Sequence, residues 1–350
     1  MSKAQLDWAN LGFAFHRTDY NIRYTWRDGA WDEGVLTSDD IIPLPMAATC
    51  LHYGQECFEG LKAFETKSGD VVVFRVEENA RRMIHTCERI MMETVPEEMF
   101  VDAVLRVVDA NRRFVPPYGT GAALYIRPLL LGTTAAVALQ PAIDYLFLVF
   151  TTPVGPYFKA GFKPVHLIVE DTADRAAPKG VGNIKVGGNY AAGMRASMNA
   201  KKLGFADVLY LDPREKRYVD EAGPANFFGI TRDGQYVTPD SESILPSITN
   251  KSLITLAEGM ELRPERRLIE IEEVFDFAEA GCCGTAAVIT PIGSITYRNR
   301  KMVYCAEDEP GRICTELYEA LTAIQIGDAP DPFGWVRVVP ELQEATRRSP

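Results

Sequence analysis

The sequence of 350 residues is poor in the patterns from which metal and dithiol sites are built. It has only four histidines, and no two of them stand at an HxxxH or HExxH spacing. Its seven cysteines form no Cys-x-x-Cys pair, and Cys282 and Cys283 are adjacent. Zinc ribbons and dithiol redox motifs need such spacings. We therefore expect no metal and seven ordinary reduced thiols.

Long apolar runs and an excess of basic residues are also missing. The most apolar stretch, around residues 145–150, falls far short of the ~20 residues of a membrane span. The first twelve residues, MSKAQLDWANLG, lack the basic and apolar regions of a secretory signal. With 37 Lys and Arg against 48 Asp and Glu, the net charge is −11, which repels phosphate backbones. We expect a soluble cytoplasmic protein with no membrane or nucleic-acid partner.

What is present is the composition of a globular protein with about two domains. The chain is 47% hydrophobic and 24% charged, and ~150 residues per domain is a common size. Residues 61–66 and 71–76 are expected to form a hairpin, followed by helices over 77–92 and 97–114 and strands near 122–131 and 144–152. The chain then becomes rich in Pro and Gly without periodicity, which predicts an interdomain loop.

The second half also mixes strands and helices. We expect strands over 165–170 and 208–211, a hairpin of 227–231 with 235–238, and helices over 189–203 and 311–324. Ser247 is expected to cap a helix that runs to residue 258. The boundaries predicted are an α/β domain over residues 1–153, a loop over 154–164 and a larger domain over 165–350, an α+β organisation.

The most informative residue is Lys185, in the run VGNIKVGGNY at positions 181–190. The run fits neither GxGxxG nor GxxxxGK[ST], so the common nucleotide motifs are excluded. A lysine lifted from solvent between glycines can lose its proton and form a Schiff base with an aldehyde. That chemistry points to pyridoxal 5′-phosphate, which also needs a carboxylate at its ring nitrogen and cationic or N–H groups at its phosphate.

With these residues in view, the chain resembles the branched-chain amino-acid aminotransferases, fold-type IV pyridoxal-phosphate enzymes with a small α/β domain and a larger pseudo-barrel domain. The resemblance covers nearly the whole length. Besides the Lys185 segment, it rests on residues 51–64 (LHYGQECFEGLKAF), 124–128 (LYIRP), 153–158 (PVGPYF), 221–228 (EAGPANFF), 244–249 (ILPSIT), 284–291 (GTAAVITP) and 331–335 (DPFGW).

The resemblance implies a role for each residue around the cofactor. Lys185 would bind it covalently, Tyr190 would hydrogen-bond its phenolic oxygen, and Glu221 would pair with the pyridinium nitrogen. The phosphate would be held by the side chains of Arg82 and Thr285 and by the N–H groups at the helix start after Ser247, which belong to Ile248 and Thr249.

The resemblance also implies a substrate pocket and a partner. The substrates would be leucine, isoleucine or valine and 2-oxoglutarate, exchanged by a ping-pong mechanism. Arg127 would orient the γ-carboxylate of glutamate, and the N–H groups of Ala286 and Ala287 would bind the α-carboxylate. Val137 and Leu139 match positions that reach the neighbouring subunit, which implies a homodimer with active sites near the interface. The aromatic walls would be Tyr53, Phe58, Tyr125 and Tyr157.

Other functions on the same fold stay open at this point. A D-amino-acid aminotransferase, an amine transaminase or an aminodeoxychorismate lyase would share the lysine and the glutamate. The segment 53–60 and the run Tyr125-Ile126-Arg127 favour the branched-chain enzymes. A binding protein without catalytic activity is a further alternative, against which the joint presence of Lys185 and Glu221 argues.

Overall fold

The computed structural model describes residues 2–155, 162–306 and 309–342. Two compact units are formed. The first takes Met1–Lys159, Lys185–Gly187 and Ile324–Pro350, and the second takes Ala160–Ile184 and Gly188–Ala323. The chain therefore enters the first unit again for three residues at Lys185. The expected domain limits at 153 and 165 stay a prediction.

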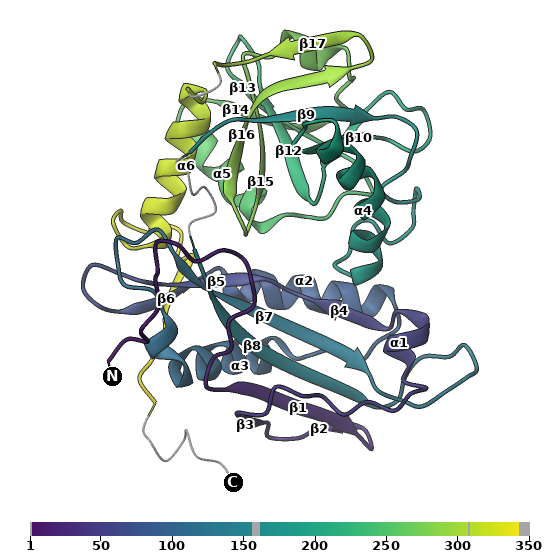
Figure 1. Cartoon of the computed structure of the whole chain (residues 1–350), viewed down its shortest axis with the longest axis vertical. Coiled ribbons are helices and arrows are strands. Elements are labelled where there is room, and N and C mark those ends of the chain that lie inside the picture. The colour runs from purple at the N-terminus through teal and green to yellow at the C-terminus, as the bar shows by residue number, and fades with distance from the viewer. Residues whose placement is uncertain (1, 156–161, 307–308, 343–350) are drawn as a thin grey trace. The chain divides into compact units, whose positions relative to one another are not determined.

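The first unit is built on an antiparallel sheet (Figure 1). Its strands run in the order β18-β6-β5-β7-β8-β1-β2, with β3 beside β1 and β4 beside β7. The predicted hairpin is confirmed, because Phe64 pairs with Val72 across it. The strands are β1 (Asn21–Arg27), β2 (Ala30–Trp31), β3 (Val35–Thr37), β4 (Glu56–Phe58), β5 (Leu61–Glu65), β6 (Val71–Phe74), β7 (Ala123–Gly132), β8 (Tyr145–Val154) and β18 (Val336–Val338).

Three helices belong to the same unit: α1 (Thr49–Tyr53), α2 (Val76–Arg89) and α3 (Glu97–Ala110), the last followed by a 3₁₀ turn at Arg112–Phe114. Helix α3 packs against β1, β7 and β8, and α2 packs against α3 and β4. Along β7 the side chains alternate, so that Leu124 and Ile126 are fully buried whereas Tyr125 and Arg127 are partly buried. The two expected helices and the two long strands are thus confirmed.

The second unit contains a closed ring of strands (Figure 1). The pairing order β11-β10-β9-β16-β15-β12 returns to β11, with β13 and β14 continuing from β12 and β17 lying beside β16. Closure removes free strand edges, and it confirms the expected barrel. The strands are β9 (Val165–Glu170), β10 (Asp207–Leu211), β11 (Val219–Ala222), β12 (Ala225–Ile230), β13 (Gln235–Pro239), β14 (Arg263–Arg267), β15 (Glu279–Gly284), β16 (Val288–Tyr297) and β17 (Arg300–Val303).

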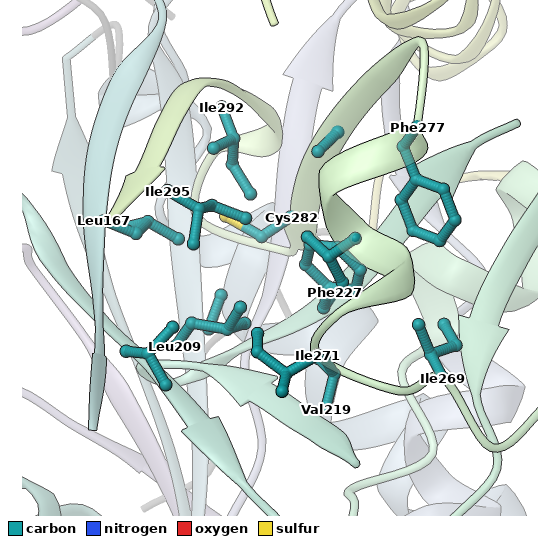
Figure 2. Packing of buried hydrophobic residues seen from close by; sticks show 14 of the residues in the cluster. Leu167, Leu209, Val219, Phe227, Ile269, Ile271, Phe277, Cys282, Ile292 and Ile295 are labelled. Carbon is teal, nitrogen blue, oxygen red and sulfur yellow. The ribbon is translucent and has the colours of Figure 1, made fainter. Parts of the chain in front are cut away.

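Apolar side chains from these strands fill the core of the second unit (Figure 2). Leu209, Phe227 and Ile295 are fully buried at its centre, and the segment that follows β14 adds Ile269 and Ile271. The helices are α4 (Gly187–Lys202), which joins the parallel strands β9 and β10, α5 (Ile248–Gly259) and α6 (Arg312–Gln325). A 3₁₀ turn covers Glu273–Asp276.

The predicted cap of α5 is confirmed, because the Ser247 side chain accepts the N–H of Asn250. This helix start belongs to the residues predicted to bind the phosphate. Among the described residues no helix is long and apolar enough to cross a membrane.

Candidate active site

The backbone around Lys185 is held by hydrogen bonds within the first unit. The Lys185 N–H donates to Thr86 Oγ1 on α2 over 3.2 Å, and the Lys185 carbonyl accepts the N–H of Phe58 on β4 over 3.2 Å. Two residues on, the Gly187 N–H donates to the carboxylate of Glu56. The segment Lys185–Gly187 is therefore fixed to β4 and α2, although the residues that flank it belong to the other unit.

The side chain of Lys185 lies beside predicted substrate residues. Its Nζ is 4.7 Å from the ring centre of Phe58, and the guanidinium of Arg127 is 4.6 Å from the same ring. Arg127 Nη2 also donates to the Tyr125 hydroxyl over 2.9 Å. The structure thus brings four of the predicted residues together on the partly buried face of the first sheet. Cations above aromatic faces are stabilised by the ring quadrupole.

The Tyr125 hydroxyl lies against Gly60, where only a residue without a side chain leaves room for it. A Cβ atom added to Gly60 would lie 2.2 Å from the hydroxyl oxygen, so no larger residue fits there. Lys62 stands directly opposite Tyr125 in the antiparallel pairing of β5 and β7, and paired residues share one face of a sheet. Burial lowers the pKa of Lys62 to about 8. This face therefore carries a third cationic side chain besides Lys185 and Arg127.

Arg82 is largely buried, unlike its neighbour Arg81. The exposed fractions of the two side chains are 10% and 56%, so Arg82 is not an ordinary surface arginine. Its Nε and Nη2 donate to the two carboxylate oxygens of Glu59 over 2.8 and 2.7 Å, and Asn79 donates to the same carboxylate over 2.8 Å. Bidentate pairing fixes the plane of a guanidinium. Arg82 is thus a rigidly oriented cation on α2.

In the second unit, Glu221 is a buried carboxylate with two partners. Its side chain is 3% exposed, and its Oε2 lies 3.0 Å from Nε of Arg175, whose side chain is 8% exposed. Its Oε1 accepts the side-chain N–H of Asn226 over 2.6 Å. An adjacent cation favours the ionised form of a carboxyl group. The arrangement provides a negative charge that is held in one position.

Glu221 and Tyr190 line one cavity of about 430 Å³ within the second unit. Arg175, Pro224 and Leu245 line it as well, and the start of α4 forms one wall through Asn189 and Tyr190. The structure therefore brings together two of the predicted cofactor residues, Tyr190 and Glu221. Asn189 is itself fixed, because its side chain donates to the Ile184 carbonyl over 2.9 Å.

The predicted phosphate donors of the second unit come from α5 and a turn. Ile248 and Thr249 begin α5, and the first N–H groups of a helix have no partner inside it. Thr285, Ala286 and Ala287 form the turn between β15 and β16. Helix α5 packs against β15, the strand that leads into this turn. The turn and the helix start therefore belong to one end of the second unit.

A further predicted aromatic residue, Tyr53, belongs to α1 of the first unit. Tyr53 is 37% exposed at the end of α1, and its hydroxyl donates to the carbonyl of Val137. Val137 and Leu139 are 86% and 83% exposed. Tyr157 lies outside the described residues. The first unit thus presents a group of exposed side chains where the resemblance places a subunit contact.

Several residues of these networks were not singled out from the sequence. Arg175, Glu59, Glu56 and Thr86 each contact a predicted residue, but each contact joins positions far apart in the chain. Glu56 and Glu59 had a signal, because both stand in the family-like run at positions 51–64.

Comparison with known proteins agrees with this geometry. Residues 56–295 match the family described as Amino-transferase class IV. The chain belongs to the class IV aminotransferases. It is 47% identical to a branched-chain-amino-acid aminotransferase of Haemophilus influenzae over 337 residues, which cover 95% of this chain and 98% of the relative. A relative of the same description from Helicobacter pylori is 46% identical over 95% of this chain and 97% of its own length.

Solved structures share the fold. The branched-chain amino acid aminotransferase of Escherichia coli has a TM-score of 0.78 at 23% identity, covering 92% of this chain and all of that one. The enzyme of the same description from Thermobaculum terrenum, solved in its PLP form, has a TM-score of 0.75 at 24% identity over 93% and 99% of the two chains. The predicted fold-type IV architecture and aminotransferase class are confirmed.

Proposed function

We propose that this protein transfers the amino group between L-leucine, L-isoleucine or L-valine and 2-oxoglutarate, with pyridoxal 5′-phosphate as its cofactor. The observation that carries the proposal is 47% identity to a branched-chain-amino-acid aminotransferase over 95% of the chain. A neighbouring structure is described with N-(5′-phosphopyridoxyl)-L-glutamate, which joins a phosphopyridoxyl group to glutamate, the amino acid that 2-oxoglutarate becomes when it accepts the amino group.

The described residues fit this cofactor by their chemistry. A pyridinium nitrogen needs a carboxylate that stays ionised, and Glu221 is buried beside Arg175. A phosphate needs cations and N–H donors, which Arg82 and the start of α5 supply. An aldehyde needs an amine, and Lys185 stands on a segment fixed by hydrogen bonds. In our assignment Lys185, Tyr190, Glu221, Arg82, Ile248, Thr249 and Thr285 hold the cofactor.

When bound, the cofactor supplies an aldehyde and an electron-withdrawing ring. The chain's own residues then do the positioning and the proton transfer. With the cofactor bound, Lys185 Nζ would act as the general base and acid, taking the proton from the substrate's α-carbon. The buried negative charge of Glu221 would favour a protonated ring nitrogen. Arg82 would hold the phosphate.

The substrate residues account for acceptance of both an apolar and an acidic side chain. Phe58, Tyr125 and Tyr157 form the apolar walls, and Arg127 orients the γ-carboxylate of glutamate. The N–H groups of Ala286 and Ala287 bind the α-carboxylate that all the substrates share. Tyr53 belongs to the same pocket.

We further propose a cytoplasmic homodimer. The exposed apolar side chains of Val137, Leu139 and Met46 (83–90% exposed) lie on segments joined by the Ala47–Ala136 hydrogen bond, and such a patch supports a subunit contact. All seven cysteines are free, and Cys57 and Cys87 keep separate thiols at a distance of 3.7 Å. An odd number of cysteines in a chain of this length supports a reducing compartment.

A panel of amino donors with 2-oxoglutarate tests the function. Leucine, isoleucine and valine should be good donors, and D-alanine should be inactive. Activity with D-alanine in place of leucine would reject the proposal in favour of a D-amino-acid enzyme. Borohydride treatment followed by peptide mass analysis tests the site, because the reduced cofactor should be recovered on Lys185 and on no other lysine.

A further inference from the structure

Two acceptor side chains, both outside the predicted site, hold the backbone on either side of the Lys185 side chain. Thr86 is 1% exposed, and its Oγ1 accepts the Lys185 N–H while its own hydroxyl donates to the Arg82 carbonyl over 3.0 Å. The Glu56 carboxylate accepts the N–H of Gly187, the first residue of α4. The lysine peptide is therefore joined to the same turn of α2 that carries Arg82.

The fit between Glu56 and Gly187 is close. A Cβ atom added to Gly187 would lie 2.5 Å from Glu56 Oε1, a distance that carbon and oxygen atoms do not adopt without a displacement. Glu56 and Phe58 point to the same face of β4, since residues two apart in a strand do so. Phe58 donates its own N–H to the Lys185 carbonyl. Strand β4 thus supplies one donor and one acceptor to the lysine segment.

We propose that Glu56 and Thr86 are positioning residues for Lys185. They fix the backbone from which the lysine side chain extends by accepting the N–H groups of Gly187 and Lys185. The inference rests on the proposed function, in which the amine of Lys185 carries out proton transfer.

The sequence explains why such support is needed. Lys185 stands between Gly182 and the pair Gly187–Gly188, and glycines lose more conformational freedom on folding than other residues. The side chain of a proton-carrying lysine has to move during turnover, so its position can be fixed only through its backbone. A displacement of about 1 Å at a reacting group costs up to ~10²-fold in rate.

Amide hydrogen exchange of the full chain without cofactor tests the Glu56 contact. Glu56→Ala should raise the exchange rate of the Gly187 amide about tenfold, the effect of losing one hydrogen bond of ~1.4 kcal/mol. Glu56→Gln keeps an acceptor oxygen and should restore most of the protection. Glu98→Ala is the control, because Glu98 is an exposed acid in the first turn of α3. Unchanged exchange in Glu56→Ala, or equal loss in Glu56→Gln, would overturn the proposal.

Thr86 is tested by a pair of nearly isosteric changes. Thr86→Val removes the acceptor of the Lys185 N–H, and Thr86→Ser restores it. In the loaded enzyme Thr86→Val should lower kcat about tenfold with the KM for leucine unchanged, and it should raise exchange at the Lys185 amide. Thr322→Val is the control, since Thr322 makes the same bond to the carbonyl four residues earlier, in α6. A fall in kcat without faster exchange would refute a positioning role.

The exchange measurements also separate this inference from the proposed function. If borohydride labels a lysine other than Lys185 in the wild-type protein, the proposed function fails whatever the exchange shows. If Lys185 is labelled but neither Glu56→Ala nor Thr86→Val changes amide exchange at residues 185 and 187, only the positioning role fails.

Discussion

Arg175 and Glu221 form a buried ion pair in the second unit, with 3.0 Å between Nε and Oε2 and exposed fractions of 8% and 3%. The guanidinium also donates to the carbonyls of Gly182 and Ser243. A buried carboxylate without a cation would take up a proton. Arg175 therefore supplies the positive charge beside the Glu221 carboxylate, and Asn226 fixes the direction in which the carboxylate points.

We expect Arg175→Met to destabilise the cofactor-free protein by about 3–5 kcal/mol, because it leaves the Glu221 carboxylate buried without its cation. Urea denaturation followed by circular dichroism measures the change. The control is Arg263→Met, which breaks a pair with Asp233 in which both side chains are 65% exposed and should cost less than about 1 kcal/mol. Similar values for both variants would show that the buried pair adds nothing beyond a surface contact.

Glu221→Gln should slow proton abstraction about 10²-fold or more. The substitution preserves shape and the hydrogen bond from Asn226 but removes the charge aimed at the ring nitrogen. Single-turnover measurement of the leucine half-reaction gives the rate of that step. If Glu221→Gln retained nearly the kcat of the wild type, the role of Glu221 would be structural only.

The features that could be predicted from the sequence are those with local signals. The hairpin of β5 and β6 has turn residues between two apolar runs, and the cap of α5 is read from Ser247 alone. Lys185 is indicated by the glycines around it, and Glu221 by a short run that matches a family. The strands β4 and β18 were not predicted, because they contain three residues each and pair with the distant strands β7 and β6. Strand β1 was also missed, although it pairs with β2 across the turn at Asp28 and Gly29.

Contacts between distant positions could not be predicted. Arg175 and Glu221 are 46 residues apart, and 131 residues separate Glu56 from Gly187. Arg175 has no sequence pattern that distinguishes it from a surface charge, and the family-like run around Glu56 does not indicate that its carboxylate accepts the Gly187 N–H. Contacts of this kind form only when strand pairing brings distant parts of the chain together. One example is the pairing of β4 with β7, which places Phe58 opposite Leu129.

Lys62 should make stability depend on pH in the alkaline range. Its pKa is about 8 in the folded protein against 10.5 as an ordinary lysine, so the unfolded chain binds more protons between these values. Below pH 8 the buried Lys62 is charged, and the full cost of burying that charge lowers the free energy of unfolding. This cost decreases as the pH rises from about 8 to 10.5, so the free energy of unfolding increases over that range.

The comparison of wild type with Lys62→Met isolates this contribution. The variant should be the more stable protein at pH 7, and the difference should shrink as the pH rises to 10. Denaturation curves at each pH measure it. Lys67→Met, in the exposed turn between β5 and β6, should show no such trend. A difference that is constant with pH would mean that Lys62 titrates normally.

Arg127→Met should impair the glutamate half-reaction more than the leucine half-reaction. Arg127 is oriented by the Tyr125 hydroxyl at 2.9 Å and by the Phe58 ring at 4.6 Å. A side-chain carboxylate brought among these aromatic walls without its cation would lose a charged hydrogen bond of ~1.5–3 kcal/mol, or roughly 10–100-fold in rate. Leucine has no charge there and should lose only a few-fold.

The same pocket should exclude aspartate and separate the aliphatic donors only weakly. The shorter carboxylate of aspartate would lose its water before reaching Arg127, which costs several kcal/mol, whereas one methylene is worth ~1–3 kcal/mol. Stopped-flow absorbance of each half-reaction measures these effects. The control is Arg23→Met, which removes an arginine from another strand of the same sheet. Arg23 lies on β1, opposite Leu148 of β8, and its side chain donates to Asn21. Equal losses in both half-reactions of Arg127→Met would mean that Arg127 supports the walls and does not bind the γ-carboxylate.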